Sequence, residues 1–562
     1  MDTKDEKAGY WVKRFEALES DRRGFWDNHL QSLSDYIIPR KAKITVKRSK
    51  GADLDEYHFD STSIHANELL ASRMQASLVP SSSKWFTLRG VFPREYQKNY
   101  KEDLNENNNV KEWFDDCAEE MFAAINASNF NTAIHELFLD LGCFGTACMS
   151  MEGTPDERGR LSGFKFQAIP IQDYVFSENI DGEVDFVIRK LKKSARQALQ
   201  RWDKKNLHPS IMEAIKEDPD QEYDFLHIVY PKEDFDPHTK KTKNNLPYGS
   251  LIIDQKNKEL VEEAGYEEFP FFVCRWAKAA GEKYGRGPGR TAISDIKVLN
   301  ACKRLEMRAW PKIIDPPIMV ENDAYIGSIK LAPSSIIPVR DINRPPIPFV
   351  IGSQWDISNL KKDELIQSIK RIFYSDQLQF PEQQSNKMTA REVMVRYELM
   401  QSLLGSTFGR IVSELLNPLI SRMFSKMDRN RMFADRPASL ADVDKLKVAY
   451  TSPLALAQKV EEAQAIDVWL ESILPLAQIE PGILSMIDLK EVARVKADLL
   501  GVPARLMRSK EEELEIEEGM KAQQEQEAQM ENTMKETQAL KNMAPFMQQA
   551  EGMMEPEMEG QL

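Results

Sequence analysis

The chain has 562 residues, of which 42% are hydrophobic, and its formal net charge is −14 at pH 7. This length exceeds one compact core, so we expect two to four structural regions, and the acidic balance argues against a protein that coats nucleic acid tightly. The five cysteines form no C-x-x-C pair, which argues against a disulfide framework and indicates a reducing compartment. Residues 1–13 lack the apolar segment of a secretory signal, and no stretch has the roughly 18 apolar residues of a membrane span. We therefore expect a soluble protein made in the cytoplasm.

The first half of the chain begins with helices and turns to strands after about residue 164. Helices are predicted at residues 7–38, 61–78, 109–125, 130–141, 194–202 and 209–215. Strands are predicted at residues 85–88, 164–166, 174–176, 184–188, 224–229, 251–254 and 271–276. Asp181-Gly182 is a hairpin signal, and Gly142 and Gly145 indicate a turn into a further strand. Residues 1–283 are therefore predicted to be an α+β region.

The central stretch reads as helix, proline-rich insert, helix, polar loop and long helix. The first helix, 291–310, follows the sequence GRGPGR and is expected to stop at Pro311, and Pro288 suits a first helical turn. Seven prolines in residues 313–351 favour short strands and turns. A second helix is predicted at 356–374.

A polar loop is predicted at residues 375–388, before the last central helix. That helix begins at a capping box formed by Thr389 and Glu392, and we expect Pro418 to kink or split it. The rest of the chain has a predicted strand at 445–451 and helices at 454–476, 489–500 and 509–541. The last twenty or so residues are expected to be disordered or ordered only by partners.

Three cations lie on one face of the first central helix. Lys297, Arg304 and Arg308 are seven and four residues apart, and the helix is about 30 Å long. Repeated around a ring, such faces would line a tube with positive charge. For one helix alone, an ordinary solvated face explains the pattern at least as well.

Sequence motifs for enzymatic chemistry are missing or incomplete. In the glycine-rich stretch, Tyr284 stands where a phosphate-binding loop needs its first glycine, and Arg290 replaces the lysine, so a structural turn is expected. His135-Glu136 is not followed by the second histidine of a zinc-protease helix. We predict no catalytic residue, metal or cofactor, although paired carboxylates for metal-dependent hydrolysis stay an alternative.

Three stretches resemble the head-to-tail connecting proteins, or portal proteins, of T7-like short-tailed bacteriophages. The first is residues 60–78 with Lys84-Trp85-Phe86, the second is residues 284–300 with Asp315-Pro316-Pro317, and the third is residues 388–393. Their order around the helix–insert–helix plan extends the resemblance over about residues 11–427. The resemblance implies a mainly helical α+β portal fold with wing, stem, clip and crown.

The implied regions divide the chain as follows. The wing would comprise residues 1–283 and 389–453, the stem helices 284–312 and 356–374, the clip 313–355, the tunnel loop 375–388, the crown 454–541 and a flexible tail 542–562. The resemblance further implies a dodecameric ring at one capsid vertex, through which DNA is packaged and ejected. The protein would then be a non-enzymatic part of the virion, assembled in the host cytoplasm and without a membrane partner.

The resemblance also implies site residues and partners. The expected channel-facing residues are Lys297, Arg304, Arg308, Lys361 and Lys362. The expected tunnel-loop residues are Gln377, Gln379, Gln383, Gln384, Asn386 and Lys387, and the expected partner-binding residues of the clip are Tyr325, Arg340 and Arg344. The implied partners are further copies of the chain, the major capsid and scaffolding proteins, the terminase large subunit, tail adaptor proteins and double-stranded DNA bound without sequence preference.

Two alternatives stay open at the level of sequence. One is a DNA-packaging enzyme subunit, an ATPase or nuclease, against which the incomplete phosphate loop argues. The other is a different internal structural protein of the virion.

Overall fold

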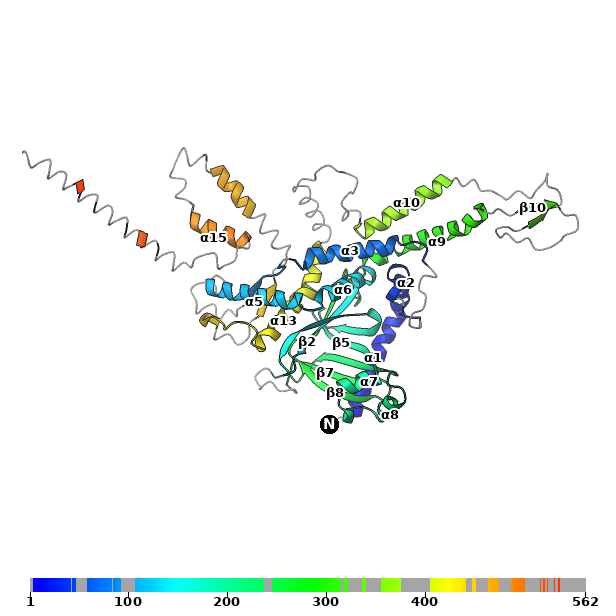
Figure 1. Cartoon of the computed structure of the whole chain (residues 1–562), viewed down its shortest axis with the longest axis horizontal. Helices are drawn as coiled ribbons and strands as arrows, with labels where there is room; N and C mark the ends of the chain where they lie inside the picture. Colours follow the sequence, from blue (N-terminus) through cyan, green and yellow to red (C-terminus); the bar gives the residue numbers. More distant parts are fainter. Residues whose placement is uncertain are drawn as a thin grey trace, which may run out of the picture. The chain divides into compact units, whose positions relative to one another are not determined.

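The structure, a computed structural model, describes residues 4–41, 43–46, 58–82, 84–91, 107–236, 245–314, 318–321, 336–339, 355–375, 405–440, 447–450, 463–473, 475, 487–500, 516, 519–520, 523, 530 and 534–535. The chain divides into two compact units. The first unit consists of Met1–Leu104 and Trp113–Gln458, and the second of Asn105–Glu112 and Lys459–Leu562. Helices and strands both contribute to the first unit, as the α+β prediction requires (Figure 1).

A five-stranded antiparallel sheet forms one core of the first unit. Its strands follow chain order: β4 (Tyr174–Glu178), β5 (Val184–Ser194), β6 (Glu222–Pro231), β7 (Tyr248–Asp254) and β8 (Glu259–Tyr266). The predicted hairpin joins β4 to β5, where Gly182 has a φ of 81°. Strand β8 was not predicted, because two successive glutamates, Glu262 and Glu263, interrupt its apolar pattern. Both are bound in the structure, Glu262 by Trp202 and Glu263 by Lys7.

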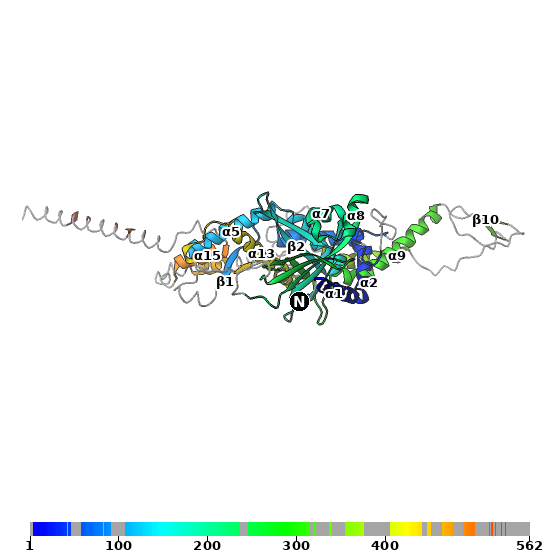
Figure 2. The ribbon, with the colours of Figure 1, turned by 90° about the horizontal axis from the view of Figure 1, so that it is seen from below.

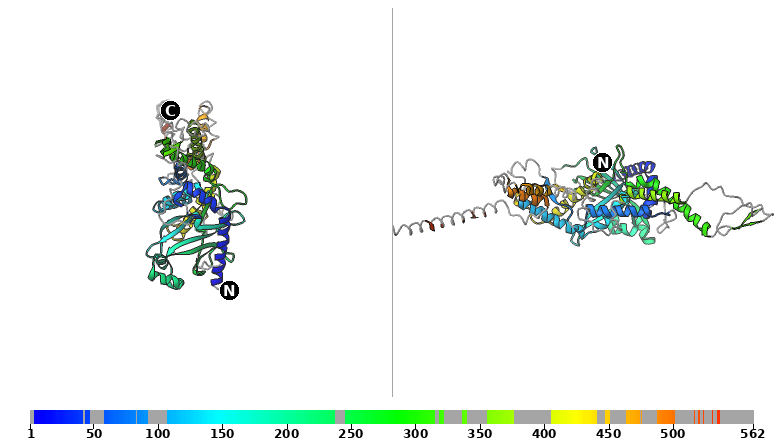
Figure 3. Two further views of the ribbon diagram at one scale, coloured as in Figure 1. Left: turned by 90° about the vertical axis from the view of Figure 1, so that its right-hand side faces the viewer. Right: turned by 90° about the horizontal axis from the view of Figure 1, so that it is seen from above.

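Alternation along these strands divides the side chains between two layers of helices. Leu226 and Ile228 pack with α1 (Lys4–Phe25), whereas Phe225, next to Leu226, packs with α7 (Ala195–Arg201) and α8 (Pro209–Glu217). This is the period of two that places neighbouring strand residues on opposite faces. Figure 2 shows α1 on one side of the sheet and α7 and α8 on the other, and Figure 3 shows α1 running along it.

The helix predicted at 7–38 is in fact two helices, α1 and α2 (Asp27–Ile37), with a break at Trp26. Buried Arg22 explains where the break falls. Its guanidinium donates to Asp27 at the start of α2 and to the carbonyls of Ile171 and Tyr174 on another part of the chain. Helical periodicity could not predict the break, because these contacts join residues that are far apart in the sequence.

A three-stranded antiparallel sheet lies beside a group of helices. Its order is β3 (Leu161–Ile169), β2 (Thr146–Pro155), β9 (Phe271–Arg275). Helix α6 (Phe130–Phe144) packs on β2 and β3, and α3 (Thr62–Leu78) packs on α6. Helix α5 spans Asn108–Asn126, and short 3-10 turns lie at Pro39–Lys41, Ile171–Asp173, Lys204–Asn206 and Ala438–Leu440.

The two predicted central helices lie side by side (Figure 1). Helix α9 spans Pro288–Ile314 and α10 spans Trp355–Ile372. The expected stop at Pro311 is wrong, because α9 continues through it to Ile314. Proline removes only one main-chain hydrogen bond, and the turn around Pro311 is exposed, so solvent can satisfy the freed carbonyl. In the insert, β10 (Ile318–Glu321) and β11 (Ile336–Val339) form a parallel pair, in line with the expected short strands.

The helix that contains Pro418, which we expected to be kinked or split, continues without a gap but includes a π-helical turn just before the proline. Residues 405–411 are helical, Val412–Leu416 form a π-helical turn, and α13 follows at Asn417–Arg429. The N–H of Asn417 donates to the carbonyl of Val412, five residues back, rather than four. Since proline has no N–H, the regular bonding pattern cannot continue across it, and the wider turn absorbs the mismatch.

The strands predicted near residues 88 and 445 pair with each other. β1 (Leu88–Val91) is antiparallel to β12 (Lys447–Tyr450), so β1 begins at the end of the predicted segment 85–88. Trp85 precedes the strand and stacks on Phe130. In the second unit, residues 463–473 are helical and α15 spans Leu489–Leu500. Of the helices described in either unit, none combines the length and apolarity needed to cross a membrane.

Candidate functional site

Helix α9 starts from a glycine-rich turn that presses against the end of α6. The N–H of Gly285 donates to the hydroxyl of Thr146 at 2.7 Å. A Cβ at Gly285 would lie 2.3 Å from the carbonyl oxygen of Gly145, and one at Gly287 would lie 2.9 Å from the nitrogen of the same residue. No side chain fits in so little space. The turn is therefore structural, as expected, and it fixes the base of α9.

The three predicted cations of α9 share one exposed face. The side chains of Lys297, Arg304 and Arg308 are all exposed, and none of them pairs with a carboxylate in the part of the chain that the structure describes. On other sides of the helix, Ile296 and Leu299 are buried. We call Lys297, Arg304 and Arg308 the basic face.

Two aromatic rings lie beside the basic face. The ammonium of Lys297 is 5.8 Å from the centre of the Tyr36 ring, and the guanidinium of Arg304 is 5.9 Å from that of Phe59. Phe59 is itself held, because its N–H donates to the side chain of Asn300 at 2.8 Å. A cation near an aromatic face at an exposed site gains about 0.5–1 kcal/mol. The rings therefore orient two of the three cations without neutralising them.

The two lysines of α10 do not extend this face. Lys362 forms an ion pair with Glu306 of α9, and only 16% of its side chain is exposed. It thus lies in the contact between the two helices, which does not fit the expectation that it faces a channel. Lys361 is exposed, but it pairs with Glu364 at 3.4 Å on its own helix. The periodicity of α10 could not reveal the Lys362 contact, because the partner is on another helix.

The remaining predicted site residues lie outside the described part of the chain. This holds for Tyr325, Arg340 and Arg344 of the clip. It also holds for the tunnel-loop residues Gln377, Gln379, Gln383, Gln384, Asn386 and Lys387.

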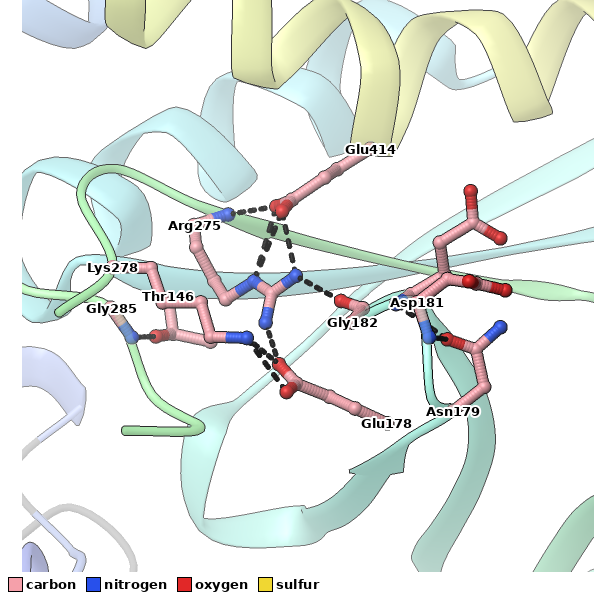
Figure 4. Close-up of polar contacts among 10 residues, drawn as sticks. Thr146, Glu178, Asn179, Asp181, Gly182, Arg275, Lys278, Gly285 and Glu414 are labelled. Atoms are coloured by element: carbon pink, nitrogen blue, oxygen red, sulfur yellow. Dashed lines mark hydrogen bonds and ion pairs between the residues drawn. The ribbon is translucent and has the colours of Figure 1, made fainter. Parts of the chain in front are cut away.

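A second group of charges, centred on Arg275, is buried in the first unit (Figure 4). The guanidinium of Arg275 is 3% exposed; it binds both oxygens of Glu414, pairs with Glu178, and donates to the carbonyl of Gly182 at 3.1 Å. Its main-chain N–H also donates to Glu414 at 2.9 Å, and Lys278 binds Glu178 at 2.7 Å. Burial alone would lower the pKa of Arg275, but the bonds to Glu414 and the charge of Glu178 raise it above its usual value.

This Arg275 cluster is built to hold elements together. Two cations meet two carboxylates, so little uncompensated charge is left to attract a ligand. The four side chains join the end of β9, the β4–β5 hairpin and the π-helical turn that contains Glu414. The sequence patterns did not predict the cluster, because its members come from distant parts of the chain. The one local signal is Arg275 itself, which directly follows four apolar residues of a buried strand.

Histidines and acidic residues form no comparable site in the ranges that the structure describes. His135 contacts the side-chain oxygen of Gln75 at 3.1 Å, which is an ordinary helix-to-helix contact. Across these ranges, no group of three or more histidine, cysteine or carboxylate side chains is placed to hold a metal ion.

The chain resembles known proteins over most of its length. The model of a family described as "Bacteriophage head to tail connecting protein" matches residues 10–507. A probable portal protein of Bordetella phage BPP-1 is 26% identical over 505 residues, which cover 88% of each chain. The portal protein of Salmonella phage epsilon15 is 24% identical over 505 residues, which cover 87% of each. A chain in a solved neck of an empty gene transfer agent particle aligns with 84% of this chain and 99% of its own, at 13% identity and a TM-score of 0.31.

Proposed function

The chain belongs to the family of bacteriophage head to tail connecting proteins, and from this premise we propose that its copies form the portal ring of a phage particle. The ring occupies one vertex of the capsid, and double-stranded DNA enters through it during packaging and leaves through it during ejection. The names of the two phage relatives, a probable portal protein and a portal protein, support this role. The match to a connecting protein does not favour the alternative of a packaging ATPase or nuclease.

The basic face of α9 is the observation that best supports passage of DNA through the ring. A channel that conducts DNA in both directions must contact the phosphate backbone without reading bases, and each contact must be weak enough to slide. Three exposed cations per copy, on a chain of net charge −14, provide local attraction without a strongly basic surface. We therefore assign Lys297, Arg304 and Arg308 to the wall of the channel.

With α9 in the channel wall, we assign the other parts of the chain to the remaining regions of a portal. Helices α9 and α10 are the stem, and the insert between them is the clip, which meets first the terminase and later the tail adaptors. The α+β part of the first unit is the wing, the residues from 375 to 388 form the tunnel loop, and the helices after residue 454 form the crown. The role is structural rather than enzymatic, and the protein is assembled in the host cytoplasm with capsid and scaffolding proteins.

The test replaces Lys297, Arg304 and Arg308 together by glutamine. We expect rings to form normally while less DNA is packaged and retained per particle, because the channel wall no longer attracts phosphate. On isolated rings, the slope of log binding constant against log salt should become shallower by about 0.9 for every phosphate that the variant no longer neutralises.

A matched control removes three exposed cations elsewhere, namely Arg158, Lys204 and Lys205. It changes the net charge equally and should leave packaging at the wild-type level. Normal DNA content and infectivity in the triple variant of α9 would refute the channel assignment, and failure of the wild-type chain to form rings in negative-stain micrographs would refute the portal role.

A further inference from the structure

Helix α9 exposes an unusual amount of apolar surface. Five of its large hydrophobic side chains are exposed: Val298 by 52%, Leu305 by 64%, Met307 by 56%, Trp310 by 60% and Ile314 by 81%. Single exposed hydrophobic residues are normal, but five on one helix mark a contact surface. Nothing in the described part of the chain covers them.

These residues form two separate edges. At about 100° per residue, Val298 and Leu305 lie about 90° to one side of the basic face, whereas Met307, Trp310 and Ile314 lie about 110° to the other side. The side opposite the basic face is already occupied by α10, where Asp295 binds Ser368 and Glu306 pairs with Lys362. We call Val298 and Leu305 the first edge, and Met307, Trp310 and Ile314 the second edge. Going around α9, the basic face is followed by the first edge, the contact with α10 and the second edge.

The two edges match each other in spacing. Val298 and Leu305 are seven residues apart, and so are Met307 and Ile314, with Trp310 between them. Residues seven apart lie one above the other after two turns, so the first edge of one α9 fits along the second edge of another. A single packed helix covers only about 100° of its neighbour, and therefore one partner cannot cover both edges.

A second copy of the chain is the occupant that satisfies both edges at once. Two different patches on opposite flanks give a head-to-tail contact, which closes into a ring when the rotation between copies permits. The segment that connects α9 to α10 is a poorer candidate to cover both edges. It leaves α9 after Ile314, and Val298 is about 24 Å further back along the helix. The apolar edges also offset the repulsion between the basic faces of neighbouring copies.

We propose that Val298 and Leu305 of one copy pack against Met307, Trp310 and Ile314 of the next, so that α9 itself forms the contact between copies. This inference rests on the proposed portal ring and names the surface that builds its channel. Val298 then meets Met307, and Leu305 meets Ile314, in each case with an offset of nine residues, or about 13.5 Å along the helix. Upright helices in a ring meet at equal heights, so the offset requires α9 to be inclined to the ring axis.

Engineered cysteines test this arrangement in the full chain. Cys302 is first replaced by serine, and the other four cysteines are buried. Val298→Cys with Met307→Cys, or Leu305→Cys with Ile314→Cys, should give a ladder of covalent multimers on a non-reducing gel after mild oxidation. A bridge within one chain is excluded, because a disulfide needs Cα atoms less than about 7 Å apart.

The controls use the same four positions. Each single cysteine variant should stay monomeric on the gel, and so should the mismatched pair Val298→Cys with Ile314→Cys, whose heights differ by about a further 10 Å. All four side chains are exposed within a single copy, so each variant chain should fold as the wild type does. Wild-type rings without a ladder from either matched pair would overturn the proposed contact and leave the portal role standing, and so would a dimer from any single variant. Absence of wild-type rings would overturn the portal role itself.

Discussion

The Arg275 cluster and the basic face of α9 place cationic side chains in opposite environments. Arg275 is buried and bound by two carboxylates, so its charge is neutralised within the fold. Lys297, Arg304 and Arg308 are exposed, and the described residues give them aromatic neighbours at most, so their charges stay available to phosphate. Burial and pairing, rather than the presence of a cation, separate a charge that is neutralised within the fold from one that is left open to a ligand.

The largest effect is expected from Arg275→Met. It leaves Glu414 and Glu178 largely out of contact with water and without their main partner, although Lys278 stays beside Glu178. Breaking a buried ion pair costs about 3–5 kcal/mol, and we expect a loss of that order in the free energy of unfolding. Urea unfolding measures it.

The control for that variant is Arg286→Met. Arg286 pairs with Glu282, but its side chain is 47% exposed, so its loss should not change the urea midpoint. If the Arg275 and Arg286 variants were equally stable, burial of the Arg275 ion pairs would contribute nothing to the stability of the fold.

The Lys41–Asp140 pair offers a second test of burial, because its carboxylate is almost fully buried and its lysine is only slightly exposed. The bond is 2.6 Å long. Burial raises the pKa of Asp140 to about 6, although Lys41 and Arg40 oppose the rise and Glu136 adds to it. The folded state therefore favours the protonated form, and the stability that this form contributes is lost as pH rises through about 6.

The variant Asp140→Asn isolates this contribution. We expect the free energy of unfolding of the wild type, relative to the variant, to fall by about 2 kcal/mol between pH 4 and pH 7, at 1.36 kcal/mol per pKa unit, because pH 4 already lies above the pKa of an unfolded aspartate. Thermal unfolding of both proteins across that range measures the difference. A difference that is constant with pH would show that the pKa of Asp140 is not raised.

Gly285→Ala tests the tight turn between strand β9, which ends at Arg275, and helix α9, which carries the basic face. The added Cβ would meet the carbonyl oxygen of Gly145, and overpacking of this kind costs about 1–3 kcal/mol. Gly9 lies in α1, and a Cβ added there would have no atom within 4 Å. Gly9→Ala should therefore stabilise the folded protein by up to about 1 kcal/mol. Melting temperatures should move in opposite directions, and equal shifts would contradict the close contact.

The smallest effect is expected at the ring beside Arg304. Phe59→Leu keeps an apolar side chain but removes the aromatic face, which is worth about 0.5–1 kcal/mol to the nearby guanidinium. A double-mutant cycle with Arg304→Gln should give a coupling of that size. A coupling near zero would mean that the ring does not orient the cation.

The sequence by itself determined the parts of this protein that depend on near neighbours in the chain. Helical periodicity located α3, α5 and α9, the Asp181-Gly182 turn located the β4–β5 hairpin, and the spacing of Lys297, Arg304 and Arg308 placed three cations on one exposed face. Pro418 indicated the place where the helix is irregular, because its missing N–H acts on its own turn.

Only the tertiary structure decided which charges are neutralised within the fold. Lys362 is next to Lys361 on the same helix, yet Lys362 pairs with Glu306 of α9, whereas Lys361 pairs only with Glu364 of its own helix and stays exposed. Arg275, Glu178 and Glu414 meet because a strand, a hairpin and a π-helical turn converge. Strand β8 is formed by pairing with β7, and its Glu262 and Glu263 contact residues from distant parts of the chain. Periodicity describes one element at a time, whereas pairing and burial are properties of elements brought together from distant parts of the chain.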